Sequence, residues 1–324
     1  MRILITGGCG FIGSHLTEYL VKKGHKITVF DKYNSTSSLG WLENSEIKKE
    51  VEFILGDIRD YDLIFKSTKK KDCILHLAAL IGIPYSYSSP LAYIRTNIEG
   101  TYNILEASKN NKIDQCIITS TSEVYGSAET NKISEKHNLK GQSPYSASKI
   151  AADQLSLSYH RSFDLPVKII RPFNTFGPRQ SVRAIIPTII LQLIQNKKYL
   201  SLGNIYPKRD FTYINDLCRA YELMIKKKSC IGEVINIGSG KSVSVKELAK
   251  KSMSIMKKQI KFKKSLKRIR KKKSEVDNLR CKNSKAAKFL GWKPKINFED
   301  SLKRTFEWYI ENYKLYDNKN TFQK

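Results

Sequence analysis

The chain has 324 residues, of which 58 are lysine or arginine and 30 are aspartate or glutamate, so its formal net charge at pH 7 is +28. This length allows one large domain or two modest ones, and a hydrophobic content of 40% is typical of a globular protein. No apolar run approaches the ~20 residues of a membrane span, and the short apolar start is no signal peptide, so we expect a cytoplasmic protein without a membrane partner.

A glycine-rich turn follows the first predicted strand. Residues 2–6 form a short apolar run that leads into Gly-x-x-Gly-x-x-Gly at 7–13, and a helix is predicted over 11–23. Glycines between a strand and a helix allow a tight turn and let a pyrophosphate approach the backbone at the helix N-terminus. The residues predicted to bind a dinucleotide here are Gly7, Gly10, Phe11, Ile12 and Gly13.

Acidic residues follow the next two predicted strands. The strand at 26–30 ends in Asp31, whose carboxylate would accept hydrogen bonds from a ribose 2′-hydroxyl and repel a 2′-phosphate. This favours NAD over NADP, although Lys32 beside Asp31 would weaken the discrimination between the two cofactors. The strand at 51–55 is followed by Asp57, which either contacts the adenine or caps a helix that starts near Tyr61.

The alternation of strands and helices continues to residue 171. A strand at 73–77 runs into the small residues Ala78 and Ala79, which let a backbone approach the cofactor. A long helix is predicted over 90–109, and a strand over 115–120 follows it. A further helix is predicted over 143–163 and a sixth strand over 167–171.

Two groups of polar residues suggest proton-transfer chemistry. Thr121, Ser122 and Glu123 follow the fifth strand, while Tyr145 and Lys149 lie four residues apart on one face of the helix at 143–163. A lysine ammonium near a phenol favours the phenolate. A phenolate can take a proton from a sugar hydroxyl while a hydride leaves the same carbon.

Short apolar strands alternating with helices predict an α/β fold of the Rossmann type, with a doubly wound parallel sheet. The functional candidates all fall at the carboxyl ends of strands, where ligands of such sheets bind. The composition shifts after residue 172, where a loop leads to an apolar helix at 185–195. Amphipathic helices are predicted at 284–290 and 300–313. The second half therefore suggests a smaller C-terminal α/β domain for substrate.

The patterns of cysteine, histidine and lysine indicate whether disulfides, a metal or nucleic acid are to be expected. The six cysteines show no C-x-x-C spacing, which suggests reduced and mostly buried thiols. The five histidines form no ligand pair, so no metal is expected. The basic residues are spread along the chain, with one dense run at 257–273 away from the cofactor motifs. We interpret them as solvated helix faces, and do not expect nucleic acid as a partner.

These motifs together resemble the extended short-chain dehydrogenase/reductase family, the NAD-dependent nucleotide-sugar epimerases and dehydratases, over residues 1–313. The matching residues, in family order, are the glycine motif, Asp31, His76-Leu77-Ala78-Ala79, Asn97 with Gly100-Thr101, Val124-Tyr125-Gly126, Tyr145 with Lys149, Arg171-Pro172-Phe173-Asn174 and Arg209-Asp210-Phe211. The resemblance implies tightly bound, recycled NAD. The further cofactor contacts that it implies are Asp57, Ile58, Leu77, Ala78, Ala79, Asn97, Tyr145 and Lys149.

The resemblance also implies a division of the chain. Residues 1–172 would bind NAD, with returning segments near 210–237, while 173–209 and 238–324 would bind the nucleotide-sugar. Substrate contacts are expected at Asn174, Arg183, Arg209 and Arg270, because amide and guanidinium groups pair with phosphates. The helices at 90–109 and 143–163 resemble the pair that forms a four-helix interface in this family, so a homodimer is expected.

Within the family, the stretches 141–155 and 171–181 are similar to the NAD-dependent 4,6-dehydratases of legionaminic acid biosynthesis, which act on nucleotide-linked N-acetylglucosamine. The implied reaction starts when Tyr145, aided by Lys149 and Thr121, removes the C4 hydroxyl proton as hydride passes to NAD. Glu123 then takes the C5 proton, the C6 hydroxyl leaves as water, and hydride returns to C6. Ser122 would position Glu123 or a water, or Glu123 would perform both steps.

Three alternatives remain open from the sequence. UDP-glucuronate decarboxylases share the Thr-Ser-Glu cluster but need a cation near the C6 carboxylate. A nucleotide-sugar C4 epimerase is the next alternative, and it is disfavoured because an epimerase does not need the carboxylate of Glu123. A non-catalytic, dinucleotide-sensing protein that binds nucleic acid would explain the charge but has little need of Thr121, Tyr145 and Lys149. The sequence does not decide between GDP and UDP.

Overall fold

A parallel seven-stranded sheet is the centre of the computed structural model, which describes residues 1–266 and 275–317. Its strand order is β10-β6-β5-β4-β1-β2-β3, and every neighbouring pair runs parallel. The strands are β1 (Arg2–Thr6), β2 (Lys26–Lys32), β3 (Val51–Gly56), β4 (Cys73–His76), β5 (Gln115–Thr119), β6 (Val167–Pro172) and β10 (Val234–Ile237). This confirms the predicted Rossmann-type α/β fold.

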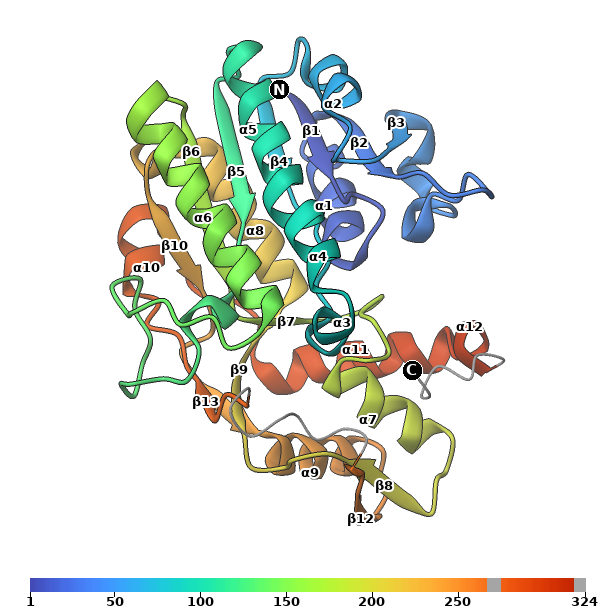
Figure 1. The fold of residues 1–324 in the computed structure, drawn as a ribbon. Helices are drawn as coiled ribbons and strands as arrows, with labels where there is room; N and C mark the ends of the chain where they lie inside the picture. Colours follow the sequence, from blue (N-terminus) through green and yellow to red (C-terminus); the bar gives the residue numbers. More distant parts are fainter. Residues whose placement is uncertain (267–274, 318–324) are drawn as a thin grey trace.

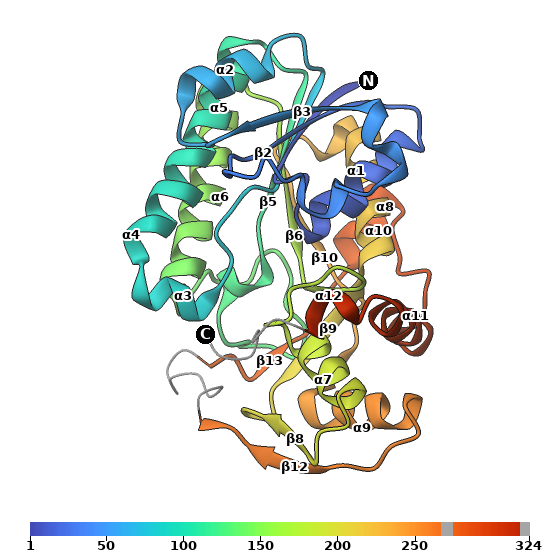
Figure 2. The same ribbon diagram turned by 90° about the vertical axis from the view of Figure 1, so that its right-hand side faces the viewer.

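Helices cover both faces of this sheet, so its central strands are buried on both sides and consist mostly of apolar residues. Helices α2, α5 and α6 lie on one face, and α1, α8 and α10 lie on the other (Figures 1 and 2). Their bounds are α1 (Phe11–Val21), α2 (Tyr61–Thr68), α5 (Gly100–Asn110), α6 (Pro144–Phe163), α8 (Ile214–Lys226) and α10 (Ser284–Leu290).

The long helix predicted over 90–109 is interrupted. It begins as α4 (Pro90–Tyr93), passes through a π-helical turn at Ile94–Glu99, and continues as α5. Such π turns occur mostly within α-helices and often at functional sites. The short helix α3 (Ile83–Ser88) precedes it.

A smaller part of the molecule lies beyond the carboxyl ends of the strands (Figures 1 and 2). Strand β9 is central to a second sheet, where it pairs with β7, β11 and β13, while β8 and β12 form a separate pair. The elements are β7 (Asn174–Phe176), α7 (Ile185–Ile194), β8 (Tyr199–Leu202), β9 (Lys208–Tyr213), β11 (Ser242–Ser244), α9 (Val245–Ile255), β12 (Lys261–Lys264), β13 (Asn278–Leu279), α11 (Phe298–Glu311) and α12 (Lys314–Asp317).

The returning segment near 210–237 is divided between the two parts. Its first residues, 210–213, lie in β9 of the second sheet, whereas α8 packs on the main sheet and β10 pairs with β6 at its edge. The main and second sheets are thus linked directly, because β9 continues into α8 without a connecting loop.

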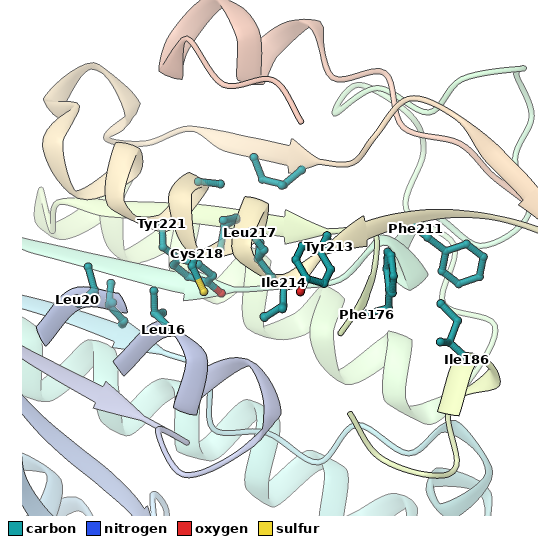
Figure 3. Packing of buried hydrophobic residues seen from close by; sticks show 14 of the residues in the cluster. Leu16, Leu20, Phe176, Ile186, Phe211, Tyr213, Ile214, Leu217, Cys218 and Tyr221 are labelled. Carbon is teal, nitrogen blue, oxygen red and sulfur yellow. The ribbon is translucent and has the colours of Figure 1, made fainter. Parts of the chain in front are cut away.

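One hydrophobic core runs through both parts. Leu16 and Leu20 of α1 approach Cys218 of α8, and the core continues to Phe176 and to Ile186 at the start of α7 (Figure 3). The rings of Phe176 and Phe211 meet edge to face, with centroids 6.1 Å apart. Burying each such side chain contributes roughly 1.5–3 kcal/mol, so the second part is anchored to the first by packing.

All six cysteines are buried, as predicted, and none of them forms a disulfide. Among the described residues, no helix is long and apolar enough to cross a membrane. No group of three potential metal ligands occurs within that same part of the chain.

Candidate active site at the carboxyl ends of the strands

The register of the main sheet brings the candidate residues together. Thr6 lies opposite Phe30 on β2 and opposite His76 on β4. The residues that follow these strands therefore emerge side by side, which places the glycine turn between Asp31 and Leu77. Only a parallel sheet gathers residues so far apart in the chain at one edge.

The glycine turn has the shape of a phosphate cradle. Gly7 has a φ of +73°, and a Cβ there would lie 2.8 Å from the backbone nitrogen of Ala78. A Cβ at Gly13 would lie 2.1 Å from the Gly7 carbonyl oxygen. At Gly10 the space is open, since a Cβ would meet only the Gly7 oxygen, at 3.4 Å. No side chain caps the N-terminus of α1, so the turn fits an anionic pyrophosphate there.

Two acidic residues flank the turn. The Asp31 carboxylate accepts a hydrogen bond of 2.7 Å from the Cys9 backbone nitrogen, which holds it beside the glycines. Asp57 forms an ion pair of 2.5 Å with Arg59, and this hydrogen-bonded partner lowers the pKa of the Asp57 carboxyl. The alternative role of Asp57 as a helix cap is wrong, because Asp60 caps α2 by accepting from the Leu63 nitrogen.

An open cavity of about 540 Å³ adjoins Asp57. Its lining is entirely polar or charged. The residues are Asp57, Arg59, Asp60, Arg95 and Glu99. Ile58 beside it is buried, and its carbonyl oxygen accepts a hydrogen bond from Asn103.

The end of β4 is held by hydrogen bonds. The hydroxyl oxygen of Thr6 accepts from the backbone nitrogens of Leu77 and Ala78, each at 3.2 Å, and Ala79 follows them, partly exposed. The Thr6 hydroxyl also contacts Nδ1 of the buried His76, at 2.8 Å. Burial lowers the pKa of His76 to about 3, so its imidazole is neutral.

Asn97 lies in the π-helical turn, with its side-chain donors used within the protein. Its Nδ2 donates to the Leu80 carbonyl oxygen at 3.0 Å and to the Ser148 hydroxyl at 2.9 Å. Its Oδ1 accepts from the Leu80 nitrogen at 2.8 Å. Asn97 therefore fixes the loop after β4 against α6 beside Lys149.

Tyr145 and Lys149 lie in the first two turns of α6. The helix begins with a capping box in which the Ser143 hydroxyl accepts from the Ser146 nitrogen at 3.1 Å. Both side chains are buried, with 8% of Tyr145 and 3% of Lys149 exposed. The ring of Tyr93 meets the Tyr145 ring edge to face, with centroids 6.2 Å apart. The phenol is therefore held rigidly.

Thr121 and its neighbours come from the adjacent strand end. The Thr121 hydroxyl accepts from the Glu123 nitrogen at 3.2 Å and so caps the 3₁₀ turn Ser122–Tyr125, in which Ser122 is buried. It also hydrogen-bonds the Tyr145 phenol. We call Thr121, Ser122, Glu123, Tyr145 and Lys149 the Tyr145 corner, since the structure brings these five predicted residues to one place.

Burial dominates the electrostatics of the Tyr145 corner. It raises the pKa of the Tyr145 phenol, the Thr121 hydrogen bond opposes that shift, and the nearby negative charge of Glu123 adds to it. Burial also lowers the pKa of Lys149, which the charge of Asp153 opposes. A cationic ligand group or the Lys149 ammonium would favour the phenolate, so the corner is suited to a proton acceptor.

The predicted substrate residues differ in how far other protein groups already engage them. Asn174 begins β7, and its Oδ1 is buried with no hydrogen-bond partner among the described residues. Arg183 is exposed, and its charge partly opposes the rise that burial causes in the pKa of the Tyr93 phenol. Arg209 is buried and already engaged, since Nη1 donates to the Val276 carbonyl oxygen at 2.6 Å and Nη2 pairs with Glu275 at 3.3 Å. Arg270 lies outside the described residues.

Comparisons with known proteins identify the family. Residues 4–305 match the GDP-mannose 4,6 dehydratase family model. The chain is 33% identical to the human dTDP-D-glucose 4,6-dehydratase, covering 98% of this chain and 92% of that protein. It is 32% identical to the low-salt glycan biosynthesis protein Agl12 of Haloferax volcanii, covering 96% and 99%.

The chain belongs to the GDP-mannose 4,6 dehydratase family.

Solved structures agree with this assignment to the extended short-chain dehydrogenase/reductases. DesIV, a dTDP-glucose 4,6-dehydratase from Streptomyces venezuelae with NAD and TYD bound, has a TM-score of 0.88 at 29% identity, covering 98% of this chain and 99% of that one. A UDP-glucuronic acid 4-epimerase mutant from Bacillus cereus, in complex with NAD and a fluorinated UDP-glucuronic acid, has a TM-score of 0.89 at 31% identity, covering 97% and 100%.

Several supporting residues of this family member were missed by sequence reasoning. Thr6 acts through hydrogen bonds to His76 and to the backbone after β4, and Ser148 through one to Asn97, and nothing in their local sequence indicates this. Tyr93 is set against Tyr145 by the π turn, which the helix pattern does not reveal. The sequence could have indicated Asp153, because this residue follows Tyr145 by two helical turns and lies on the same helix face.

Proposed function

We propose that this family member is an NAD-dependent 4,6-dehydratase that converts GDP- or UDP-N-acetylglucosamine into the corresponding 4-keto-6-deoxy sugar. The observation that carries the proposal is the proximity of Glu123 to Tyr145, whose pKa its charge raises. A phenol that deprotonates C4 and a carboxylate that deprotonates C5 must lie this close, because the two carbons are bonded. A C4 epimerase needs no such carboxylate.

NAD is the proposed cofactor, and the residues fit it. The open side of Gly10 and the uncapped α1 N-terminus suit a pyrophosphate, and Asp31 is held beside them to accept from a ribose hydroxyl. The polar cavity beside Asp57 would take the adenine end. When bound, NAD would accept a hydride from C4 and later return it to C6. Similar proteins of the family contain NAD in their structures.

The chain's own residues divide the proton transfers among them. Tyr145, as phenolate, takes the C4 hydroxyl proton, and Thr121 hydrogen-bonds the phenol. Lys149 supplies positive charge beside the phenolate. Glu123 takes the C5 proton, which the new 4-ketone acidifies, and delivers a proton to the departing C6 hydroxyl. Ser122 is buried next to Glu123, where it positions that carboxyl.

Substrate binding is proposed for the second part, residues 173–209 and 238–324. Asn174 offers a buried acceptor that no other described residue hydrogen-bonds, and a sugar hydroxyl would satisfy it. Arg183 lies near Tyr93, so its cation faces the Tyr145 side. Arg209 would instead shape the pocket, since its guanidinium is bound to Glu275 and Val276. A net charge of +28 would steer a doubly charged nucleotide-sugar towards this cleft.

The sugar and the pathway follow from the resemblance of 141–155 and 171–181 to legionaminic acid 4,6-dehydratases. We propose that the product enters synthesis of a deoxy or nonulosonic sugar for a surface glycan. UDP-glucuronate is the second candidate substrate, for decarboxylation or C4 epimerisation. It is favoured by Arg183, a cation near Tyr93 that could pair with a C6 carboxylate.

A homodimer is proposed through the outer faces of α4, α5 and α6. These faces expose large apolar side chains, which soluble proteins normally cover. They are Leu91, Ile94, Tyr102 and Phe163, each between 44% and 55% exposed.

The test is incubation of the purified protein with UDP- and GDP-N-acetylglucosamine and with UDP-glucuronate, without added NAD, followed by mass spectrometry. Loss of one water from an N-acetylglucosamine nucleotide is the expected result, and it also identifies the nucleotide. Loss of carbon dioxide from UDP-glucuronate would move the protein to the decarboxylases. Tyr145→Phe is the control, in which any enzymatic product should disappear.

A further inference from the structure

The first three turns of helix α6 carry three buried ionisable side chains, each one turn from the next. Tyr145, Lys149 and Asp153 are four residues apart and therefore share one helix face. Their exposed fractions are 8%, 3% and 0%. The proposed proton transfers use the first two, and Asp153 has no part in them. A fully buried carboxylate is costly unless it is paired, so its presence here calls for a physical reason.

The contacts of Asp153 join α6 to two strand ends. Its Oδ2 accepts from the Ser120 hydroxyl at 2.6 Å and from Nε of Arg171 at 2.9 Å, and Nη2 of Arg171 lies at 2.9 Å as well. Ser120 directly follows β5 and precedes Thr121, while Arg171 lies in β6. One carboxylate thus fixes the helix that bears Tyr145 against the strand end that leads to Thr121.

The same pair also supports the turn that bears Glu123. Nη1 of Arg171 donates to the Tyr125 hydroxyl at 2.9 Å, and that hydroxyl donates to Oδ1 of Asn236 at 2.7 Å. The Arg171 guanidinium lies 5.1 Å from the centre of the Tyr125 ring. Tyr125 ends the 3₁₀ turn Ser122–Tyr125, so every residue of the Tyr145 corner lies on an element that this network touches.

The charges around Asp153 are unequal. Two buried cations, Lys149 and Arg171, share one carboxylate, whose Oδ1 has no hydrogen-bond partner among the described residues. His76, which also faces Lys149, is neutral, because burial lowers its pKa to about 3. The other titratable neighbours of the Tyr145 phenol are Glu123 and Tyr93. Within the described part of the chain, Asp153 is the group whose charge raises the pKa of Lys149, opposing burial.

We propose that Asp153 is a positioning residue that holds α6 to the ends of β5 and β6 and supplies the negative charge that balances the Lys149 ammonium. This inference rests on the proposed function only in that Tyr145 and Lys149 are the reacting pair. It applies equally to a dehydratase, a decarboxylase or an epimerase, because all begin by deprotonating the C4 hydroxyl.

The test follows the titration of Lys149 by NMR in the full-length protein, with lysine labelled at ¹³Cε. The Lys149 signal is identified by its loss in Lys149→Met. In Asp153→Asn the titration midpoint should fall by about one pH unit, since an opposing charge at close range shifts a pKa by one unit or more. Arg171→Met should move the midpoint upwards, because the carboxylate then acts on Lys149 alone.

Matched controls separate charge from structure. Ser120→Ala removes a neutral partner of the carboxylate, and Asp153→Glu keeps the charge, so both should leave the Lys149 midpoint near that of the wild type. If Asp153→Asn alone does not fold, the double variant Arg171→Met/Asp153→Asn, which removes the whole ion pair, is compared with Arg171→Met, and its Lys149 midpoint should be the lower of the two. A Lys149 midpoint that does not fall when the Asp153 carboxylate is removed, in whichever of these backgrounds folds, would overturn the proposal.

A second measurement ties the titration to turnover. With a nucleotide-sugar that the wild type converts, the alkaline limb of the pH–rate profile should shift to lower pH in Asp153→Asn by the same amount as the NMR midpoint. A purely structural role would lower the rate at every pH without moving the limb. The NMR result needs no substrate, so a wrong substrate assignment would leave it intact.

Discussion

The surroundings of the Tyr145 corner and the β7 segment (residues 174–180) differ in how their polar atoms are hydrogen-bonded. Around Tyr145, neighbouring groups form hydrogen bonds with one another. Asn97 donates to the Ser148 hydroxyl, and the Thr6 hydroxyl accepts from the Ala78 backbone nitrogen. Along the β7 segment, three side chains bury polar atoms without a partner among the described residues. These are Oδ1 of Asn174, Nη1 of Arg179 and Oε1 of Gln180. Asn97 and Thr6 beside the Tyr145 corner are thus already engaged by protein groups, whereas the three atoms of the β7 segment would gain hydrogen bonds from a bound ligand.

This difference matches a division of labour between the two regions. Groups that transfer protons must be held in place before substrate arrives, and a finished hydrogen-bond network does this. Groups that recognise a substrate contribute most when their buried donors and acceptors are otherwise unpaired. Replacing residues in the Tyr145 corner should therefore affect proton transfer, and replacing residues in the β7 segment should affect substrate binding.

Removing the Tyr145 hydroxyl should have the largest effect on rate. Tyr145→Phe is expected to lower kcat by about 10²–10⁴-fold, because it deletes the group that accepts the C4 proton. Bound NAD, released by denaturation and quantified, should be unchanged, since the ring still packs against Tyr93. A variant that keeps NAD and retains its turnover would show that Tyr145 is not the base.

Two glycines of the phosphate cradle should separate folding from cofactor binding. Gly13→Ala would force a Cβ to within 2.1 Å of the Gly7 oxygen, so we expect at least ~3 kcal/mol loss in the free energy of unfolding. Gly10→Ala meets only one atom, at 3.4 Å, and should fold normally but bind NAD weakly. Denaturation curves and NAD content measure the two effects. Equal stability of both variants would contradict this view of the turn.

Acid should destabilise the protein through two histidines, the buried His76 and the partly buried His15. Burial lowers the pKa of His76 to about 3 and of His15 to about 4. Because both folded-state values lie below the ordinary value of 6.5, this stability is present above pH 6.5 and is lost as the pH falls. Each histidine should contribute about 1.4 kcal/mol per pH unit below the unfolded value.

Urea denaturation at a series of pH values checks this prediction. His15→Gln removes one titrating group outside the Tyr145 corner, so the slope of unfolding free energy against pH should fall by about 1.4 kcal/mol per pH unit between pH values of roughly 6 and 4. An unchanged slope would mean that His15 binds its proton equally well in the folded and unfolded chains.

Asn174 should affect binding rather than chemistry. Asn174→Ala removes the unpaired acceptor of the β7 segment, and we expect KM to rise about tenfold with kcat nearly unchanged, the effect of one hydrogen bond. Thr175→Ala is the matched control, since that hydroxyl donates to the Phe173 carbonyl oxygen within the protein. A fall in kcat at constant KM would place Asn174 with the Tyr145 corner instead.

Local spacing explains what the sequence could predict. The glycine turn, Asp31 and the Tyr145–Lys149 pair each depend on neighbours within one strand-to-helix unit, and the parallel sheet then gathers them. Arg209 was assigned to substrate because guanidinium groups bind phosphate, but its ion pair with Glu275 joins residues far apart in the chain. Asp57 lost its capping role to Asp60, which lies immediately before Tyr61, the first residue of the helix.

The most direct test of the account uses the proposed N-acetylglucosamine nucleotide carrying deuterium at C4. NMR of the product should show the deuterium at C6, because the hydride that is removed from C4 beside Tyr145 returns to C6 of the same molecule. Deuterium that stays at C4, with or without inversion, or that is lost to solvent, would contradict the dehydratase assignment.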